Sequence, residues 1–188
     1  MITQKNTAII IPSRLAATRL PNKPLIMIND KPMIYHVWER ACESNLGKVI
    51  VATDNIEIQK VIEDSGGDSC LTSVDHQSGT DRIFEALQKY DSENKIEYVV
   101  NLQGDLPNID ADSLLRVLQL LENKEVNIGT LVVKINEESD LDKEQIVKAL
   151  CIFKENERNT KALDFQRLPK DITINNLGDS TQNIISSK

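Results

Sequence analysis

Cations gather in the segment that follows the first apolar run of the sequence. Ile9–Ile11 and Pro12 lead into a loop that carries Arg14, Arg19 and Lys23 at intervals of five and four residues. Guanidinium and ammonium groups can grip the oxygens of a polyanion together, so this pattern predicts a site for a phosphate-bearing ligand. The alternative is a loop whose cations are merely exposed to solvent, because charged residues usually lie on the surface.

Two further segments carry residues suited to the same chemistry. Asp105 ends the run Gln103–Asp105 after an apolar segment, and a carboxylate in that position is a good oxygen ligand for Mg²⁺. Arg82 lies in the first turn of the helix that Ser78–Asp81 predicts, where a cation is unfavourable unless an anion binds nearby. The structural alternatives are a turn at Gly104-Asp105 and a helix cap at Ser78.

Cations on one loop and a metal-binding carboxylate on another are the parts that phosphoryl-type transfer needs. The charge that develops on the phosphates must be neutralised, and a metal must hold the reacting phosphate in line. The sequence has neither a G-x-x-x-x-G-K-[ST] motif nor a G-x-G-x-x-G motif after its first apolar run. An ordinary P-loop ATPase and a dinucleotide dehydrogenase are therefore both disfavoured.

The strands and helices that must position these residues alternate along the chain. Apolar runs predict strands, and stripes of apolar residues at i, i+3, i+4 and i+7 predict helices between them. This succession predicts an α/β fold with a mostly parallel, Rossmann-like sheet and helices on both faces, in which the three polar segments meet at one edge. The predicted strands lie at 7–11, 48–52, 68–71, 98–102, 128–135 and 147–153, and Asn29-Asp30 predicts a turn. The helices begin near Pro32, Asp54, Ser78 and Asp110 or Asp112, and Asp54 is predicted to cap the second of them.

Composition limits the classes of partner and compartment. The 188 residues carry a net charge of −7, which argues against general binding to nucleic acid or to an anionic membrane. No apolar run approaches the roughly 20 residues of a membrane helix, and the polar N-terminus is no secretory signal. The scattered Cys42, Cys70 and Cys151 have no metal-ligand spacing and fit reduced thiols. We therefore expect a cytoplasmic protein.

The C-terminal part of the sequence differs from the rest. From Glu155 onward the composition turns polar, and the few apolar residues follow no clear period. We expect a nucleotide-binding domain over 1–154, followed by an irregular segment at 155–188 that is disordered towards its end.

Several motifs in the same order resemble the 3-deoxy-D-manno-octulosonate (Kdo) cytidylyltransferases, also called CMP-Kdo synthetases. The likeness is strong over 8–133 and weaker as far as Pro169. It implies a fold of the nucleotide-diphospho-sugar transferase type. The motifs that carry it are Ile10–Arg14 with Thr18–Leu25, Lys31–Ile34, Val51–Asp54, His76–Arg82 and Val100–Asp105.

The resemblance implies roles for individual residues. In the family reaction, the anomeric hydroxyl of Kdo attacks the α-phosphate of CTP, which gives pyrophosphate and CMP-Kdo for lipopolysaccharide synthesis. Arg14, Arg19 and Lys23 would line the triphosphate and act in catalysis. Asp105 would act with them and hold Mg²⁺. The residues that would bind CTP are Ser13, Arg14, Arg19, Lys23, Ser78, Gly79, Arg82 and Gln103.

The sequence also departs from the family pattern. Leu106 stands where the family usually has an acidic residue. Two later family segments, one of which supplies a second metal-binding aspartate, have no counterpart in the chain, and both contribute to Kdo binding and to the dimer interface. Two readings follow. The chain is a Mg²⁺-dependent cytidylyltransferase with CTP and Kdo as substrates, or it is a shortened form that binds nucleotide with weak or no catalysis. A homodimer like that of the family would have an incomplete interface.

Overall fold

The computed structural model describes residues 1–15, 20–167 and 182–187 of the chain. It forms two compact units, Met1–Asn123 and Lys124–Lys188, each with its own four-stranded sheet. The boundary after Asn123 differs from the predicted one at 154. The difference arises because the strand near 147–152 pairs with strands that follow it in the sequence, and not with the first sheet.

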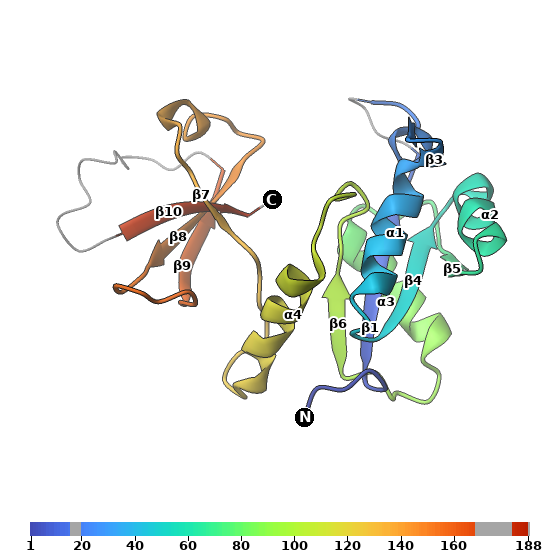
Figure 1. The fold of residues 1–188 in the computed structure, drawn as a ribbon, viewed down its shortest axis with the longest axis horizontal. Helices are drawn as coiled ribbons and strands as arrows, with labels where there is room; N and C mark the ends of the chain where they lie inside the picture. Colours follow the sequence, from blue (N-terminus) through green and yellow to red (C-terminus); the bar gives the residue numbers. More distant parts are fainter. Residues whose placement is uncertain (16–19, 168–181, 188) are drawn as a thin grey trace. The chain divides into compact units, whose positions relative to one another are not determined.

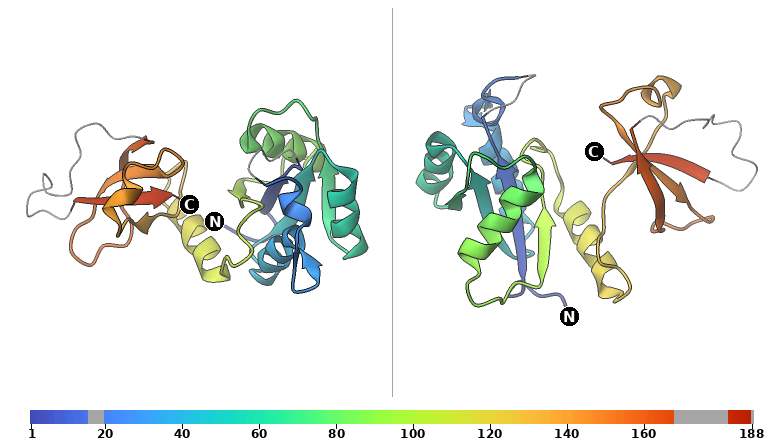
Figure 2. Two further views of the ribbon diagram at one scale, coloured as in Figure 1. Left: turned by 90° about the horizontal axis from the view of Figure 1, so that it is seen from above. Right: turned by 180° about the vertical axis from the view of Figure 1, so that it is seen from behind.

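The first unit is a parallel sheet with helices on both faces, as predicted (Figure 1, Figure 2). Its strand order is β5-β4-β1-β6, and every neighbouring pair is parallel. The strands are β1 (Thr7–Ser13), β4 (Lys48–Thr53), β5 (Asp68–Leu71) and β6 (Tyr98–Asn101). The helices are α1 (Met33–Glu43), α2 (Ile56–Asp64), α3 (Gly79–Tyr90), α4 (Ala111–Gln119) and the short 3-10 helix η2 (Leu120–Glu122).

The central strand β1 is continuously apolar because both of its faces are covered. Ile9 and Ile11 pack in one cluster with α1, α2 and α4, whereas Ala8 and Ile10 pack in a second cluster with α3. Successive side chains of a strand point to opposite faces of the sheet, so a strand buried on both faces shows no polar alternation. This burial fixes the carboxyl end of β1, where the strand ends at Ser13 and the loop that carries Arg14 begins.

Side-chain caps start three of the helices. Ser78 caps α3 as the sequence predicted, and of the two predicted alternatives for α4, Asp110 and Asp112, the cap is Asp110. At α2 the prediction of Asp54 was wrong: Asn55 is the cap, and its side chain accepts from the amides of Glu57 and Ile58. Asp54 is therefore available for another contact. None of the described helices is long and apolar enough to cross a membrane.

A short turn and a hairpin connect β1 to α1. The turn is the 3-10 helix η1 (Lys23–Leu25), and the hairpin pairs β2 (Met27–Ile28) with β3 (Lys31–Pro32). Asn29 and Asp30 have φ angles of 47° and 64°, in the left-handed region that Asn and Asp tolerate better than most residues. The predicted turn at these two residues is confirmed.

The second unit contains an antiparallel sheet with the order β7-β10-β8-β9. Ala149 and Cys151 form its small buried cluster. Lys148 is fully buried, and its Nζ donates to the carbonyl oxygens of Lys143 and Arg167 at 2.6 and 2.5 Å. The elements are β7 (Val133–Lys134), η3 (Glu138–Asp140), β8 (Val147–Ile152), β9 (Ala162–Gln166) and β10 (Gln182–Ser187).

Predictions for this region need correction. The strand expected at 128–135 is present only at Val133–Lys134, and β8 is antiparallel instead of continuing the parallel sheet. The segment from 155, predicted to be irregular, contains β9 and β10. An apolar run indicates a strand but not its partner, and β9 and β10 owe their form to pairing with β8. The rest of that segment, 168–181 and Lys188, lies outside the described residues.

Candidate active site

A cleft of about 240 Å³ opens at the carboxyl edge of the parallel sheet. The end of β1, the turn η1, the start of α3 and the loop after β6 all contribute to it, as expected where parallel strands end together. The structure thus confirms the prediction that the three polar segments meet at one edge of the sheet. The lining residues are Pro12, Ser13, Arg14, Lys23, Pro24, Met33, His76, Ser78, Gly79, Arg82, Gln103, Gly104 and Asp105.

Close backbone packing sets the floor of the cleft. A Cβ atom at Gly104 would lie 2.9 Å from the carbonyl oxygen of Pro12, closer than real Cβ contacts come. A Cβ atom at Gly79 would lie 3.3 Å from the ring of Pro12. Glycine therefore lets the loop after β6 and the start of α3 approach the end of β1. This approach brings Asp105 towards the basic loop.

Lys23 and Asp105 join two sides of the cleft by an ion pair. The Lys23 Nζ lies 2.8 Å from Asp105 Oδ2, and the two side chains are 36% and 51% exposed. An ion pair this exposed contributes at most about 1 kcal/mol. Both groups can therefore exchange their partner for a ligand at small cost. Arg14 also lines the cleft, whereas Arg19 lies outside the described residues.

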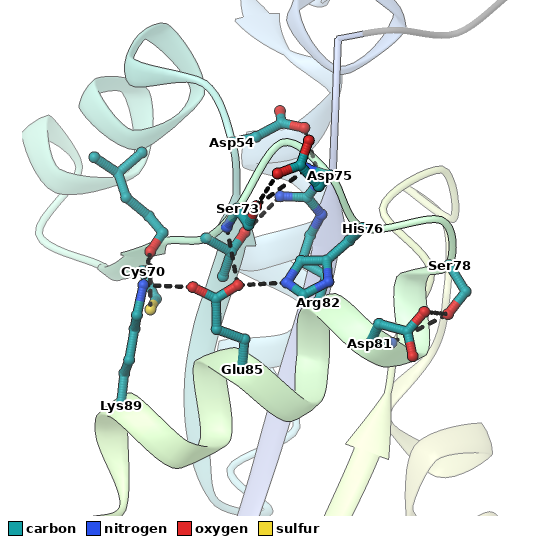
Figure 3. Close-up of polar contacts among 12 residues, drawn as sticks. Asp54, Cys70, Ser73, Asp75, His76, Ser78, Asp81, Arg82, Glu85 and Lys89 are labelled. Atoms are coloured by element: carbon teal, nitrogen blue, oxygen red, sulfur yellow. Dashed lines mark hydrogen bonds and ion pairs between the residues drawn. The ribbon is translucent and has the colours of Figure 1, made fainter.

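Arg82 is anchored far more firmly. The residue is 2% exposed, and its Nη2 lies 2.6 Å from Asp54 Oδ2, while its Nη1 donates to Thr72 Oγ1 at 2.5 Å (Figure 3). Thr72 Oγ1 in turn donates to the carbonyl oxygen of Thr53 at 3.1 Å. Arg82 thus ties α3 to the ends of β4 and β5. A guanidinium group has five N–H donors, so it retains donors for the cleft that it lines.

Three smaller polar side chains complete the predicted set. Ser78 Oγ accepts from the Asp81 amide and donates to Asp81 Oδ2, so its hydroxyl is occupied as a helix cap. Gln103 Nε2 donates to Asn101 Oδ1 at 2.8 Å. The Ser13 hydroxyl is buried and has no hydrogen-bond partner among the described residues. An unpaired buried hydroxyl costs roughly 1–3 kcal/mol, which a ligand in the cleft can recover.

A histidine that lines the cleft was missing from the predicted site. His76 Nε2 contacts Glu85 Oε2, and the same carboxylate accepts from the Ser73 amide at 2.9 Å and from Lys89 Nζ at 2.5 Å (Figure 3). The Lys89 ammonium and the Ser73 amide, followed by His76, lower the pKa of Glu85 to about 2. The sequence signals were the position of His76 beside the predicted helix cap and its place in the His76–Arg82 motif, whereas no spacing rule links it to Glu85.

The acidic residues limit how a metal could be held. No group of three or more His, Cys, Asp or Glu residues in the described part of the chain could hold a metal ion. Asp105 is the one acidic side chain among the described residues that line the cleft. A single carboxylate beside cationic side chains fits Mg²⁺, which takes one or two carboxylates and completes its shell with phosphate oxygens and water.

Comparison with known proteins identifies the family. The family model described as cytidylyltransferase matches residues 8–176. The chain belongs to the cytidylyltransferase family. This result confirms the resemblance inferred from the motifs. The fold of this chain also matches a solved structure, that of CMP:2-keto-3-deoxy-manno-octonic acid synthetase complexed with CTP. The match has a TM-score of 0.75 and 30% identity, and it covers 97% of this chain and 71% of that one.

Curated relatives of this cytidylyltransferase carry a more specific name. The 3-deoxy-manno-octulosonate cytidylyltransferase of Brucella canis is 45% identical over 167 residues, which are 89% of this chain and 66% of that protein. The enzyme of the same name from Rhizobium leguminosarum bv. trifolii is 49% identical over 142 residues, which are 76% of this chain and 57% of that protein. The chain therefore spans less than two thirds of the length of these relatives.

Proposed function

We propose that the chain is a Mg²⁺-dependent 3-deoxy-manno-octulosonate cytidylyltransferase. It would transfer CMP from CTP to the anomeric hydroxyl of Kdo, release pyrophosphate and form CMP-Kdo for lipopolysaccharide synthesis. The observation that carries this proposal is the cleft that combines Arg14 and Lys23 with Asp105 in a chain of the cytidylyltransferase family. The relatives named above support Kdo as the acceptor.

The cations of the cleft would act on the triphosphate. Attack at the α-phosphate breaks its bond to the β-phosphate, so negative charge develops on the departing pyrophosphate. Arg14 and Lys23 line the cleft where they could neutralise that charge. Arg19, four residues before Lys23 in the sequence, is proposed to join them. No protein nucleophile is required, because the hydroxyl of the sugar is the attacking group.

The carboxylate of Asp105 would hold Mg²⁺. When bound, the ion would supply positive charge that stabilises the reacting phosphates. Asp105 is paired with Lys23 through Oδ2, so the Lys23 ammonium would compete with a cation for the carboxylate. We infer that Lys23 moves to the phosphates when the cation binds, because both partners of the ion pair then gain stronger contacts.

The remaining predicted residues would orient the nucleotide. Gly79 lines the cleft and opens α3, a helix of 12 residues, and the start of a helix favours anions. Ser13 offers an unpaired hydroxyl, and Gln103 offers an amide at the sheet edge. Arg82 would contribute its remaining donors from a fixed position, since Asp54 and Thr72 hold the guanidinium group.

The test is pyrophosphate release from CTP and Kdo in the presence of Mg²⁺. We expect turnover by the wild-type chain and a loss of roughly 100- to 1000-fold in Asp105→Ala, the size of effect that follows removal of one charge-stabilising group. Asp112→Ala is a matched control, because Asp112 lies on α4 and pairs with Arg116. CTP binding without turnover in the wild type would contradict the transferase proposal and assign nucleotide binding alone.

A further inference from the structure

The loop between β5 and α3 is fastened to α3 by one carboxylate. Glu85, in the middle of α3, accepts from the amide of Ser73 at the start of the loop and contacts the ring of His76 near its end (Figure 3). Lys89, one helical turn further, holds the other oxygen of the carboxylate at 2.5 Å. The side chains of His76 and Glu85 are 21% and 23% exposed. The ring of His76 is therefore fixed where it lines the cleft.

This arrangement determines which ring nitrogen of His76 carries the proton. A carboxylate is only an acceptor when ionised, and Glu85 stays ionised at neutral pH because its neighbours lower its pKa to about 2. Its partner Nε2 must therefore be the N–H donor. In the neutral ring the second nitrogen, Nδ1, is then an acceptor. Nδ1 has no hydrogen-bond partner within the described parts of the chain.

We propose that His76 binds the nucleotide through Nδ1, and that Glu85 is a positioning residue that fixes the ring and its tautomer for that contact. This inference rests on the proposed function, since it assumes that the cleft holds CTP. The proposal adds His76 as a binding residue, and Glu85 as the residue that positions it, to the cations and the carboxylate already described.

Because Nδ1 is an acceptor, it can form a hydrogen bond only with a part of the ligand that carries a donor. Phosphate oxygens are acceptors too, so the Nδ1 of the Nε2–H tautomer cannot donate to them. The nucleoside part of CTP offers donors, in the ribose hydroxyls and the amino group of the base. His76 therefore contacts the nucleoside, while the cations of the cleft contact the triphosphate.

The substitution His76→Gln tests this contact. The glutamine amide reaches the place of Nε2 and can still donate to Glu85, but it leaves no acceptor at the place of Nδ1. We expect affinity for CTP to fall roughly 3- to 10-fold, the value of one hydrogen bond. Affinity for inorganic tripolyphosphate stays unchanged. Both are measured by calorimetry on the full chain.

His36→Gln is the matched control for this test. His36 is the other of the two histidines of the chain, and its Nε2 contacts the carbonyl oxygen of Ile28 on the β2–β3 hairpin. We expect no change in CTP affinity. Equal CTP affinity in His76→Gln and the wild type would overturn the proposal, as would an equal loss of tripolyphosphate binding. A wild-type chain that binds no CTP would overturn the proposed function as well, so the two failures are distinct.

The positioning role of Glu85 has its own readout. Glu85→Ala removes the acceptor for His76 and for Ser73, whereas the oxygen of Glu85→Gln can still accept from both. We expect the ¹⁵N spectrum of His76 to show the Nε2–H tautomer in the wild type and in Glu85→Gln, and a mixture of tautomers in Glu85→Ala. CTP affinity follows the same order. An unchanged His76 spectrum and CTP affinity in Glu85→Ala would overturn the role.

Lys89→Met separates positioning from a general effect on the helix. Lys89 also contacts Glu85, but its side chain is 52% exposed and it does not line the cleft. We expect this variant to keep the wild-type tautomer of His76 and the wild-type CTP affinity. A loss of CTP affinity as large as that of Glu85→Ala would overturn the assignment to the His76 contact. Should Glu85→Ala fail to fold, Glu85→Asp takes its place, because the shorter side chain withdraws the carboxylate from His76. A mixture of tautomers with weaker CTP binding is then expected, and an unchanged His76 spectrum and CTP affinity would overturn the role.

Discussion

At the scale of residues, the cleft combines loosely held and firmly held charges. Lys23 and Asp105 face each other at the surface, so their contact is weak and exchangeable. Arg82 is buried against Asp54 and Thr72, so its position is fixed before any ligand arrives. The first pair suits groups that must change partners during binding, and the second suits a group that holds the site in shape.

Lys23→Met should affect the two ligands of the cleft in opposite directions. Without its cation, Asp105 should bind Mg²⁺ alone more tightly, by about 2- to 5-fold, because an exposed ion pair is worth at most about 1 kcal/mol. Affinity for CTP should fall by roughly 10-fold or more, since a charge-assisted contact to phosphate is lost. Mn²⁺ binding followed by electron paramagnetic resonance measures the first effect, and calorimetry measures the second.

The control for this prediction is Lys31→Met. Lys31 also forms an exposed ion pair, with Glu39 at 3.5 Å, and it does not line the cleft. Neither affinity should change in this variant. A Lys23→Met chain that loses Mg²⁺ and CTP affinity together would show that the Lys23–Asp105 pair does not compete with the ligands.

Asp54→Ala should destabilise the first unit by about 2–3 kcal/mol. The change leaves the guanidinium group of Arg82 buried without its anionic partner, and breaking a buried ion pair in this way is costly. The partial exposure of Asp54 reduces the cost below the upper end of the range for buried pairs. Urea unfolding followed by the fluorescence of Trp38, the one tryptophan of the chain, reports on the unit concerned.

Asp112→Ala provides the comparison for that measurement. Asp112 pairs with Arg116 across one turn of α4, and both side chains are more than half exposed. Its loss should change the free energy of unfolding by no more than about 0.5 kcal/mol. Equal costs for the two aspartates would mean that Asp54 is not the structural partner of Arg82.

At the scale of elements, α3 has two structural roles. Its first turn borders the cleft at Gly79 and Arg82, and its middle holds the loop after β5 through Glu85. The pKa of Glu85 is lowered to about 2. A carboxyl group with a lowered folded-state pKa adds stability above its unfolded pKa and loses that contribution as the pH falls towards the folded value.

The attachment of the loop to α3 should therefore weaken in acid. The difference in stability between the wild type and Glu85→Gln should shrink as the pH falls below about 5 towards 2. The measurement is a series of urea unfolding curves for both chains between pH 7 and about pH 3. A difference that grows on acidification would contradict the assigned contacts of Glu85.

The elements also show what the sequence can and cannot predict. Continuous apolar runs predicted the parallel strands, and Ser78 and Asp110 predicted two helix starts, because these signals are local. The antiparallel partners of β8 could not be predicted, since pairing with β9 and β10 joins distant segments. Asp54 was misassigned as a cap for the same reason: its partner Arg82 lies 28 residues further along the chain.

At the scale of the whole molecule, the described cleft lies entirely within the first unit. Each residue that lines it precedes the boundary at Asn123. The family match continues to residue 176, into the second unit, and the chain spans 66% of the length of the Brucella canis relative. Nucleotide binding is thus proposed for the first unit by itself, while transfer to Kdo is proposed for the chain as a whole.

The most direct test of the central claim is a ³¹P NMR time course of CTP and Kdo with the chain and Mg²⁺. We predict that the three phosphate resonances of CTP are replaced by pyrophosphate and one phosphodiester in equal amounts, and that CTP without Kdo stays intact. CTP resonances that remain unchanged in the presence of Kdo, while CTP binds to the chain, would contradict the assignment as a cytidylyltransferase acting on Kdo.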